Sequence, residues 1–413
     1  MPATLTLLRN AEIYDPAARG RHDLLVSSPP SASGASGGII LAMERSFDLA
    51  GLDALIGPGV CEVVDLAGAR VIPGLVDSHV HLTGGGGESG PASRVPSVAL
   101  SALTRGGITS CVGVLGTDGT TRNVASLVAA VLGLRAEGLS AWCWTGSYEV
   151  PPITLSGSVR SDIVFVDPVI GVGEVAISDH RSSQPTFDEL VRLAADCHVA
   201  GMMSGKAGVL HLHLGDGARG LELVRRAITE TELPPSVFHP THVNRNQRLF
   251  AEALELAARG VTIDVTAFPV AEGEDAFSAP DAIRKYLESG APRDRLTCSS
   301  DGGGCLPTYD AQKRIVAMDV GRPSALAEAL EELLASGLAL EDVLPVFTSN
   351  VAAALRLPGK GRIAVGADAD LVVLDANHRI RDVMARGRFH VRTDGRRPRG
   401  EAVVTGMFEE PRK

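Results

Sequence analysis

The central part of the chain alternates two kinds of hydrophobic pattern. Short, nearly continuous apolar runs are typical of buried strands, and longer stretches with apolar residues three and four positions apart are typical of helices. Their regular alternation between residues 71 and 355 predicts β-α units around a parallel sheet. The runs that we interpret as strands are residues 71–76, 107–115, 140–145, 168–177, 208–214, 236–242, 261–267 and 295–300. The stretches that we interpret as helices are residues 97–105, 123–137, 186–200, 219–231, 247–258, 282–289, 325–335 and 340–355.

Eight strands that alternate with helical stretches are the arrangement expected of a (β/α)₈ barrel, the TIM fold. A doubly wound open sheet is the alternative interpretation. No Gly-x-Gly-x-x-Gly sequence follows any of the predicted strands, so the barrel is favoured. We expect it to occupy residues 68–356.

The two ends of the chain have a different pattern. Both contain short β-like runs and no long helical stretch, and residues 27–38 (SSPPSASGASGG) have the composition of a loop. We therefore predict one small β domain built from residues 1–67 and 357–413 together. Its strands are predicted at residues 4–8, 23–26, 39–43, 60–64, on both sides of a Gly-Ala-Asp turn within 362–375, and at 389–391 and 401–404.

Composition excludes several classes of protein. The chain has 413 residues, which suggests two to three domains, and 45% hydrophobic with 21% charged residues is ordinary for a globular protein. The net charge is −10, and no basic cluster is dense enough for a nucleic-acid surface. We expect a small-molecule ligand, and no nucleic acid or membrane as partner.

Targeting signals and cysteine usage favour a cytoplasmic location. The first 15 residues lack a basic segment followed by a long apolar one, so they do not resemble a signal peptide. The most apolar stretch, 124–134, is far shorter than the roughly 20 residues that span a bilayer. The six cysteines have no paired spacing, which suits free thiols in a reducing compartment.

The stretch VIPGLVDSHVHLTGGGGESG, residues 71–90, contains the first chemical signal. His79 and His81 are two residues apart on a strand, so their imidazoles project to the same side. Two imidazoles on one face are a natural start for a zinc site. Four consecutive glycines and Glu88 follow, and such a loop lets the backbone approach a ligand closely.

Other ionisable residues end further strands of the predicted barrel, where barrel enzymes hold their active sites. Histidines and carboxylates that converge there predict a hydrolytic site with two zinc ions. The six candidate ligands are His79, His81, Glu174, His213, His242 and Asp301.

The remaining histidines and most cysteines receive a structural interpretation. His211 lies two residues before His213 on the same face, and we expect it to fill the barrel or to support a ligand from behind. His239 is expected to be structural, whereas His180 could orient its neighbour Arg181. The histidines expected at the surface or in packing are His22, His198, His378 and His390, and the cysteines expected in the core are Cys61, Cys111, Cys143, Cys197 and Cys298.

These residues, taken together, resemble the amidohydrolase superfamily over essentially the whole chain. The ordered motifs VDSHVHLTGGGGESG, LGTDG, TGSY, ISDHR, HLGD, PTHVNR and SSDGGG resemble the isoaspartyl dipeptidases within it. The resemblance implies a distorted barrel with a β-sandwich contributed by both termini. It also implies a cytoplasmic homo-oligomer, possibly an octamer, that acts as a metallopeptidase with two Zn²⁺ per chain.

The resemblance also assigns substrate contacts. Glu88 would bind the α-amino group of the substrate, and Tyr148 would polarise the scissile carbonyl. Arg181 and Arg245 would hold the terminal carboxylate, while Gly86 and Thr117 would line the pocket. The chemistry of these residues is suitable, since a carboxylate complements an ammonium group, arginine forks complement carboxylates, and tyrosine can donate to an oxyanion.

Two positions depart from the resemblance. A carbamylated lysine is expected on the fourth strand to bridge the metals, but residues 168–177 contain no lysine and Glu174 occupies the motif position. Some amidohydrolases use glutamate as the bridge, and Gly171 and Gly173 would permit a closer approach. Cys305 stands near the expected substrate carboxylate, where serine is expected.

The sequence therefore predicts a binuclear zinc peptidase that hydrolyses β-aspartyl (isoaspartyl) dipeptides. A hydroxide between the metals would attack the amide carbonyl, and Asp301 would transfer the proton to the leaving amine. One alternative is a cyclic amidase or an N-acyl amino acid deacylase of the same superfamily. Others are a mononuclear deaminase and a non-catalytic protein that retains the fold.

Overall fold

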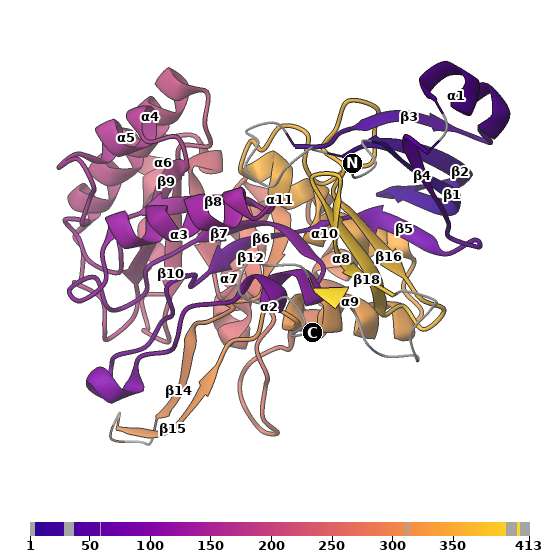
Figure 1. Ribbon diagram of the computed structural model, residues 1–413. Coiled ribbons are helices and arrows are strands. Elements are labelled where there is room, and N and C mark those ends of the chain that lie inside the picture. The colour runs from indigo at the N-terminus through magenta and orange to yellow at the C-terminus, as the bar shows by residue number, and fades with distance from the viewer. Residues whose placement is uncertain are drawn as a thin grey trace.

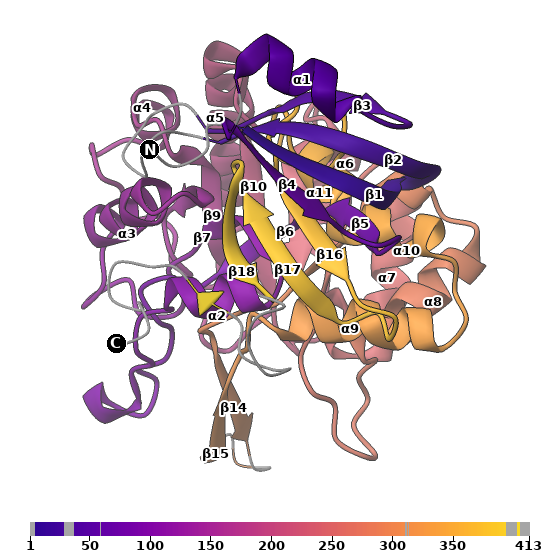
Figure 2. The same ribbon diagram turned by 45° about the vertical axis from the view of Figure 1, so that its right-hand side comes forward.

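The computed structural model describes residues 5–28, 37–57, 59–309, 312, 314–393 and 403–404. Two bodies of secondary structure are visible, a ring of parallel strands with helices around it and a mixed sheet beside it (Figures 1 and 2). None of the helices in these residues is both long enough and apolar enough to cross a lipid bilayer. Most of the predicted loop at 27–38 and part of the predicted strand at 401–404 lie outside the described residues.

The parallel strands follow one another around the ring in chain order. The first six form one sheet, and the last two form a separate pair beside the sixth. A parallel bridge between Val80 and Gly302 brings the last strand back to the first, and the His81 N–H donates to Gly302 O at 2.8 Å. Within the described residues the eight strands are β6 Leu75–Val80, β7 Ile108–Gly113, β8 Ser140–Thr145, β9 Val169–Ile177, β10 Val209–Leu214, β11 Phe238–Thr241, β12 Ile263–Thr266 and β13 Leu296–Ser299.

This curled parallel sheet is consistent with a distorted TIM barrel, and seven of its eight strands lie where the sequence predicted them. The first was predicted at residues 71–76 and overlaps β6 only at Leu75 and Val76, because Arg70–Pro73 forms a separate strand of the mixed sheet. The helices between the strands cover its outside (Figure 1). They are α2 Leu100–Arg105, α3 Val124–Ala136, α4 Val159–Phe165, α5 Phe187–Ser204, α6 Glu222–Glu230, α7 Gln247–Ala258, α8 Ala279–Ser289, α9 Ala325–Ala335, α10 Leu340–Phe347 and α11 Ser349–Ala354. Short 3₁₀ turns occupy Pro91–Ser93, Pro235–Val237, Val243–Arg245 and Arg293–Arg295.

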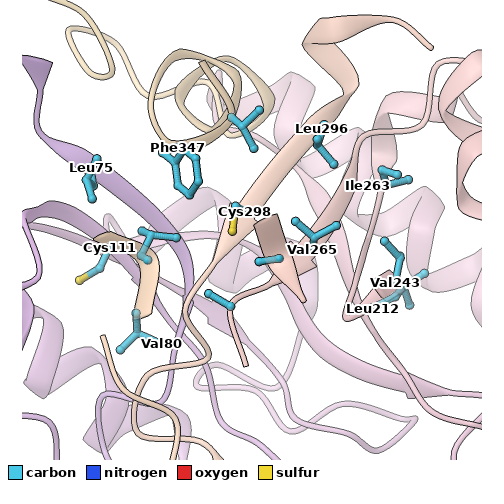
Figure 3. Packing of buried hydrophobic residues seen from close by; sticks show 14 of the residues in the cluster. Leu75, Val80, Cys111, Leu212, Val243, Ile263, Val265, Leu296, Cys298 and Phe347 are labelled. Carbon is cyan, nitrogen blue, oxygen red and sulfur yellow. The ribbon is translucent and has the colours of Figure 1, made fainter. Parts of the chain in front are cut away.

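Local sequence explains where these helices begin. Helix α5 starts at a capping box in which Thr186 accepts from the Glu189 N–H and the Glu189 carboxylate accepts from the Thr186 N–H. Its buried face repeats at helical spacing through Leu190, Leu193 and Cys197. An apolar layer between the strands and the surrounding helices holds the two together, with Leu75, Cys298 and Phe347 in one cluster (Figure 3).

The mixed sheet contains strands from both ends of the chain. The N-terminal strand β5 pairs antiparallel with the C-terminal strand β16, and the sheet has its own apolar cluster around Leu8, Ile13 and Val71. The joint assembly of the two ends is therefore present in the structure, while a two-layered sandwich and the domain boundaries stay predictions. The nine strands of this sheet in the described residues are β1 Leu5–Asp15, β2 Ala17–Ser27, β3 Ile40–Glu44, β4 Cys61–Asp65, β5 Arg70–Pro73, β16 Leu371–Leu374, β17 Ile380–Ala385, β18 Arg388–Arg392 and β19 Val403–Val404.

Several local predictions were wrong or incomplete. The first of the two strands predicted within 362–375 does not form, and the predicted helix 340–355 is two helices separated at Thr348, whose φ of −138° and ψ of −89° are not helical. Helix α1, Leu49–Ile56, lies in the N-terminal part, where no long helical pattern was found. Helix α4 and an antiparallel hairpin of β14 Cys305–Tyr309 and β15 Ile315–Val320 were not predicted.

Candidate metal and substrate site

A cavity of about 1100 Å³ opens at the carboxyl ends of the barrel strands. All the predicted site residues line it except His79, which is fully buried just below. The barrel therefore brings together the side chains that sequence reasoning placed at separate strand ends. His211 and His239, which we expected to be structural, lie behind His79 and do not line the cavity.

One half of the predicted ligand set surrounds a single oxygen of Glu174. Glu174 Oε1 lies 3.5 Å from His79 Nε2 and 3.4 Å from His81 Nε2. Asp301 Oδ1 lies 3.4 Å and 3.0 Å from the same two nitrogens. His79, His81 and Asp301 thus offer ligand atoms close enough together to share one metal ion.

The other half surrounds the second oxygen of the same carboxylate. Glu174 Oε2 lies 3.1 Å from His213 Nδ1 and 3.5 Å from His242 Nε2. His79, Glu174 and His242 also form a group whose ligand atoms are close enough to hold a metal. Glu174 therefore lies between two pairs of histidines, with one oxygen directed to each pair.

The electrostatics of this cluster suit a cation. Burial alone would raise the pKa of Glu174, but His79 and His213 outweigh it and hold that pKa well below its usual value. Burial likewise opposes ionisation of Asp301, yet His79 and His81 lower its pKa. For His79, burial favours the neutral ring, but the charges of Glu174 and Asp301 raise its pKa well above the usual value. A metal ion would replace that proton.

Hydrogen bonding gives an independent test of whether a metal fits. Among the described residues, no hydrogen bond of suitable geometry reaches Asp301 Oδ1, although the atom is buried. A buried carboxylate oxygen without a well-formed hydrogen bond is costly unless it binds a cation. Imidazole nitrogens and carboxylate oxygens are ligands that zinc commonly takes in hydrolytic sites. The residues present therefore fit a metal site.

Asp179 was the alternative candidate for a bridging carboxylate, and its contacts are different. Asp179 Oδ2 lies 2.8 Å from Arg181 Nη2 and 3.0 Å from His213 Nε2. Of the four candidate histidine ligands, only His213 contacts it in the described part of the chain. The geometry therefore favours Glu174 for the central position.

The backbone around the ligands explains how the short glutamate reaches that position. A Cβ atom on Gly171 would lie 2.3 Å from Val209 O, and one on Gly173 would lie 2.7 Å from His211 Cβ. Strand β9 therefore packs against its neighbour at a distance that only glycine allows at these two positions. His242 and Asp301 have φ of 63° and 52°, a left-handed conformation that is strained for both and that turns the chain directly after the strand.

Glu88, which the sequence predicts to bind the amino group of the substrate, also lines the cavity. Glu88 Oε1 accepts from Thr117 Oγ1 at 2.9 Å and from Arg181 Nη1 at 3.3 Å. Glu88 Oε2 is buried and has no hydrogen-bond partner within the described residues. One oxygen is thus held in place, and the other is available to a donor from a ligand.

Arg122 holds the glycine loop that presents Glu88, and sequence reasoning missed it. Its guanidinium donates to Thr83 O at 3.2 Å and Val95 O at 3.1 Å and pairs with Asp118 at 3.2 Å. The side chain is 5% exposed. A buried arginine within a polar loop can be recognised only after its carbonyl partners are placed in space.

The other predicted substrate residues also face the cavity. The Tyr148 hydroxyl lies 2.8 Å from His213 Nδ1, and burial raises its pKa well above the usual value, so it remains a donor. Arg245 Nη1 donates to Leu214 O at 2.6 Å. Cys305 is half-buried near Gly86, and burial raises the pKa of its thiol to about 12.

Two further segments of the wall carried no recognisable signal in the sequence. Residues 268–271 and 274–276 form part of the rim, and Leu306, Thr308 and Asp319 from the unpredicted hairpin form another part. Strand β15 of this hairpin exposes Val316, Met318 and Val320 (62%, 38% and 41%), so among its residues of described burial no face is buried.

Comparison with known proteins extends over nearly the whole chain. A model of the amidohydrolase family matches residues 70–392. The structure of a β-aspartyl dipeptidase from Fervidobacterium islandicum AW-1 in complex with the β-Asp-Leu dipeptide is 40% identical, with a TM-score of 0.87 over 95% of this chain and 97% of that chain. A second structure of β-aspartyl dipeptidase from that organism gives 40% identity and a TM-score of 0.82 over 94% and 97%. A dihydroorotase of Anaplasma phagocytophilum (strain HZ) is 28% identical over 349 residues, which are 77% of this chain and 76% of the relative.

Proposed function

Since the chain belongs to the amidohydrolase family and is a metal-dependent hydrolase, we propose that it hydrolyses β-aspartyl (isoaspartyl) dipeptides. The observation that carries the proposal is the shared carboxylate of Glu174, whose two oxygens face separate histidine pairs. In this proposal His79, His81, Glu174 and Asp301 would hold one zinc ion, and Glu174, His213 and His242 would hold a second.

The charges around the cavity support a substrate with both an ammonium group and carboxylates. The buried, unpartnered Oε2 of Glu88 would accept from the ammonium of the β-aspartyl unit. Arg181 and Arg245, which both lie beside His213, would bind carboxylates of the dipeptide. The 40% identity to a β-aspartyl dipeptidase supports the same substrate class.

The protonation states of Asp301 and Tyr148 suggest a different role for each in the reaction. Zinc bound there would supply Lewis acidity and an activated water at neutral pH. Asp301, which is ionised, would accept the proton of the attacking water and return it to the leaving amine. Tyr148, which remains protonated, would donate a hydrogen bond to the oxyanion that develops on the scissile carbonyl.

A metal analysis and a substrate panel test this proposal together. Protein purified without chelator should contain close to two equivalents of transition metal, and it should cleave β-Asp-Leu in preference to α-Asp-Leu and N-acetyl-leucine. Full activity in protein stripped of metal would refute the metal site. Faster cleavage of N-acyl amino acids or cyclic amides would favour the alternative activities, and a metal-free, inactive protein would indicate a non-catalytic member of the family. The oligomeric state and the cytoplasmic location stay predictions.

A further inference from the structure

A continuous chain of buried side chains runs from the candidate metal ligand His79 into the barrel interior. His79 Nδ1 lies 2.8 Å from His211 Nε2, and His211 Nδ1 lies 3.0 Å from His239 Nδ1. His239 Nε2 lies 3.0 Å from Thr297 Oγ1, which donates to Asp264 Oδ1 at 2.6 Å. Each of these five side chains is at most 2% exposed. Solvent therefore cannot replace any link.

The far end of the chain fixes the direction of every hydrogen bond in it. Asp264 accepts on both oxygens, because Thr241 and Ser299 donate to Oδ2 at 2.7 Å and 2.5 Å while Thr297 donates to Oδ1. Besides His239, the Thr297 hydroxyl has Ile263 O as a neighbour at 3.3 Å, and a carbonyl oxygen can only accept. The hydroxyl proton of Thr297 is therefore directed to an acceptor, and its oxygen must accept from the Nε2–H of His239.

This direction propagates through both imidazole contacts. A neutral histidine has one N–H and one lone pair, so a proton on Nε2 of His239 leaves Nδ1 as an acceptor. His211 must then carry its proton on Nδ1 and accept on Nε2, and His79 must donate from Nδ1. Consequently the proton of neutral His79 is held on Nδ1, and its Nε2 lone pair faces Glu174 and Asp301.

We propose that His211, His239, Thr297 and Asp264 are positioning residues that fix the tautomer and ring orientation of His79 for metal binding through Nε2. The inference rests on the proposed metal site but adds a function to residues outside it. Ligating histidines depend in this way on the acceptor of their other ring N–H. Here the acceptor is a relay that ends on a buried carboxylate. The His211 ring also stacks on Trp144, with centroids 5.1 Å apart and planes inclined by 13°. This contact restrains the orientation of the imidazole ring.

Thr297 allows the most selective test because it touches none of the proposed ligands in the described residues. Thr297→Val removes the hydroxyl and frees the tautomer of His239, whereas Thr297→Ser keeps the hydroxyl. Zinc affinity, measured by competition with a chromophoric chelator, should fall at one of the two sites about tenfold in Thr297→Val, as for other outer-shell partners of ligating histidines. Thr297→Ser should remain within about twofold of the unaltered protein, well inside that range.

Ser299→Ala is the matched control, since it removes another buried hydroxyl from the same Asp264 without touching the histidine chain. Its zinc affinity should be unchanged. A spectroscopic readout is independent of metal affinity: in zinc-loaded protein labelled with ¹⁵N-histidine, His239 should carry its proton on Nε2 and His211 on Nδ1. Signals are assigned by their loss in His239→Asn and His211→Asn.

The outcomes separate this inference from the proposed function. Equal zinc affinity in Thr297→Val and Thr297→Ser, or an equal loss in Ser299→Ala, would overturn the positioning role while leaving the metal site intact. The opposite tautomers in the spectra would overturn it directly. Failure of the unaltered protein to bind zinc would overturn the metal site itself and the inference that depends on it.

Discussion

Two clusters of buried polar side chains differ in whether their hydrogen-bonding atoms all find partners within the protein. Lys360, which is 5% exposed, joins the barrel to the mixed sheet and has three acceptors. They are Ser140 Oγ at 2.5 Å, Asp370 Oδ2 at 2.6 Å and Asp368 Oδ2 at 2.7 Å. An ammonium group has three protons, so each finds an acceptor.

The cluster at the mouth of the barrel is arranged in the opposite way. His79 Nε2 and His81 Nε2 lie only 3.4 Å apart and both face Asp301 Oδ1, for which the described residues provide no well-formed hydrogen bond. Ligand atoms face one another, and a cation is needed to satisfy them. The comparison teaches that a buried polar cluster indicates a binding site when some of its atoms lack hydrogen-bond partners. It indicates a structural role when every atom has one.

The largest expected effect follows from removing the charge of Glu174, which lies between the two halves of the proposed metal site. Glu174→Gln should lose at least one metal, because a neutral amide bridges two cations poorly. The loss of several kcal/mol of electrostatic stabilisation should lower kcat roughly a thousandfold or more. Elemental analysis and steady-state kinetics measure both effects. Asp179→Asn is the control and should retain both metals.

The proposed bridging role of the Glu174 carboxylate can also be tested by metal reconstitution and by a second substitution. A glutamate carries its carboxylate permanently, so metal reconstitution of the apo-protein should not depend on bicarbonate. Glu174→Lys should bind metal poorly, and added bicarbonate should rescue it only in part. A Glu174→Gln protein with two tightly held metals and normal turnover would remove Glu174 from the site.

Mutation of the Lys360 cluster should lower the stability of the fold and leave metal binding and catalysis unchanged. Lys360→Met leaves the buried Asp370 without its counter-charge, and breaking a buried ion pair in this way costs about 3–5 kcal/mol. Asp368, whose side chain is 31% exposed, can be solvated and adds less. The thermal midpoint should fall, while metal content and kcat at 25 °C remain unchanged.

Lys206→Met provides the matched control. Lys206 Nζ donates to three backbone carbonyls, those of Ile163, Val166 and Val169, and its removal strands no charge. Its thermal midpoint should fall less. If Lys360→Met instead lost metal at constant stability, the division between the two clusters would be wrong.

Arg245 should affect substrate affinity and leave both clusters intact. Removing one partner of a buried charged contact costs about 2–5 kcal/mol, so Arg245→Met should raise KM for β-Asp-Leu by about 30-fold or more. The C-terminally amidated dipeptide should be a poor substrate for the unaltered enzyme and should lose little further activity in the variant.

Arg248→Met is the control, because Arg248 also lines the cavity but is exposed and donates to Ala218 O and Gly217 O. It should change KM little. Equal cleavage of amidated and free dipeptides by the unaltered enzyme would contradict the role of Arg245.

The sequence was sufficient to predict the barrel and the ring of candidate ligands, because both depend on local periodicity. Alternation within a strand places His79 and His81 on one face, and the strand ends then converge by the geometry of the barrel. Glu174 was identified in the same way, and the structure directs its two oxygens to separate histidine pairs.

Features that depend on register between strands could not be predicted. His211 and His239 are partners across β10 and β11, and nothing in either strand alone indicates that their rings meet. The Lys360 cluster unites residues from β8 and from the segment before β16. The break at Thr348 had a visible signal in Pro345, since proline within a helix disturbs its hydrogen bonds, but the apolar periodicity of 340–355 concealed it.

The smallest expected effect concerns Cys305, where the resemblance to isoaspartyl dipeptidases leads us to expect serine. The half-buried thiol lines the cavity near Gly86, and with its pKa raised to about 12 by burial it stays protonated. A thiol is a weaker hydrogen-bond donor than a hydroxyl. Cys305→Ser should therefore strengthen a contact to the substrate carboxylate by about 0.5–1.5 kcal/mol and lower KM for β-Asp-Leu roughly two- to tenfold, with kcat and metal content unchanged. Cys61→Ser makes the same chemical change in strand β4 of the mixed sheet and should leave KM unaltered. An unchanged KM in Cys305→Ser would show that the substrate carboxylate does not reach this wall, and would leave its recognition to the arginines alone.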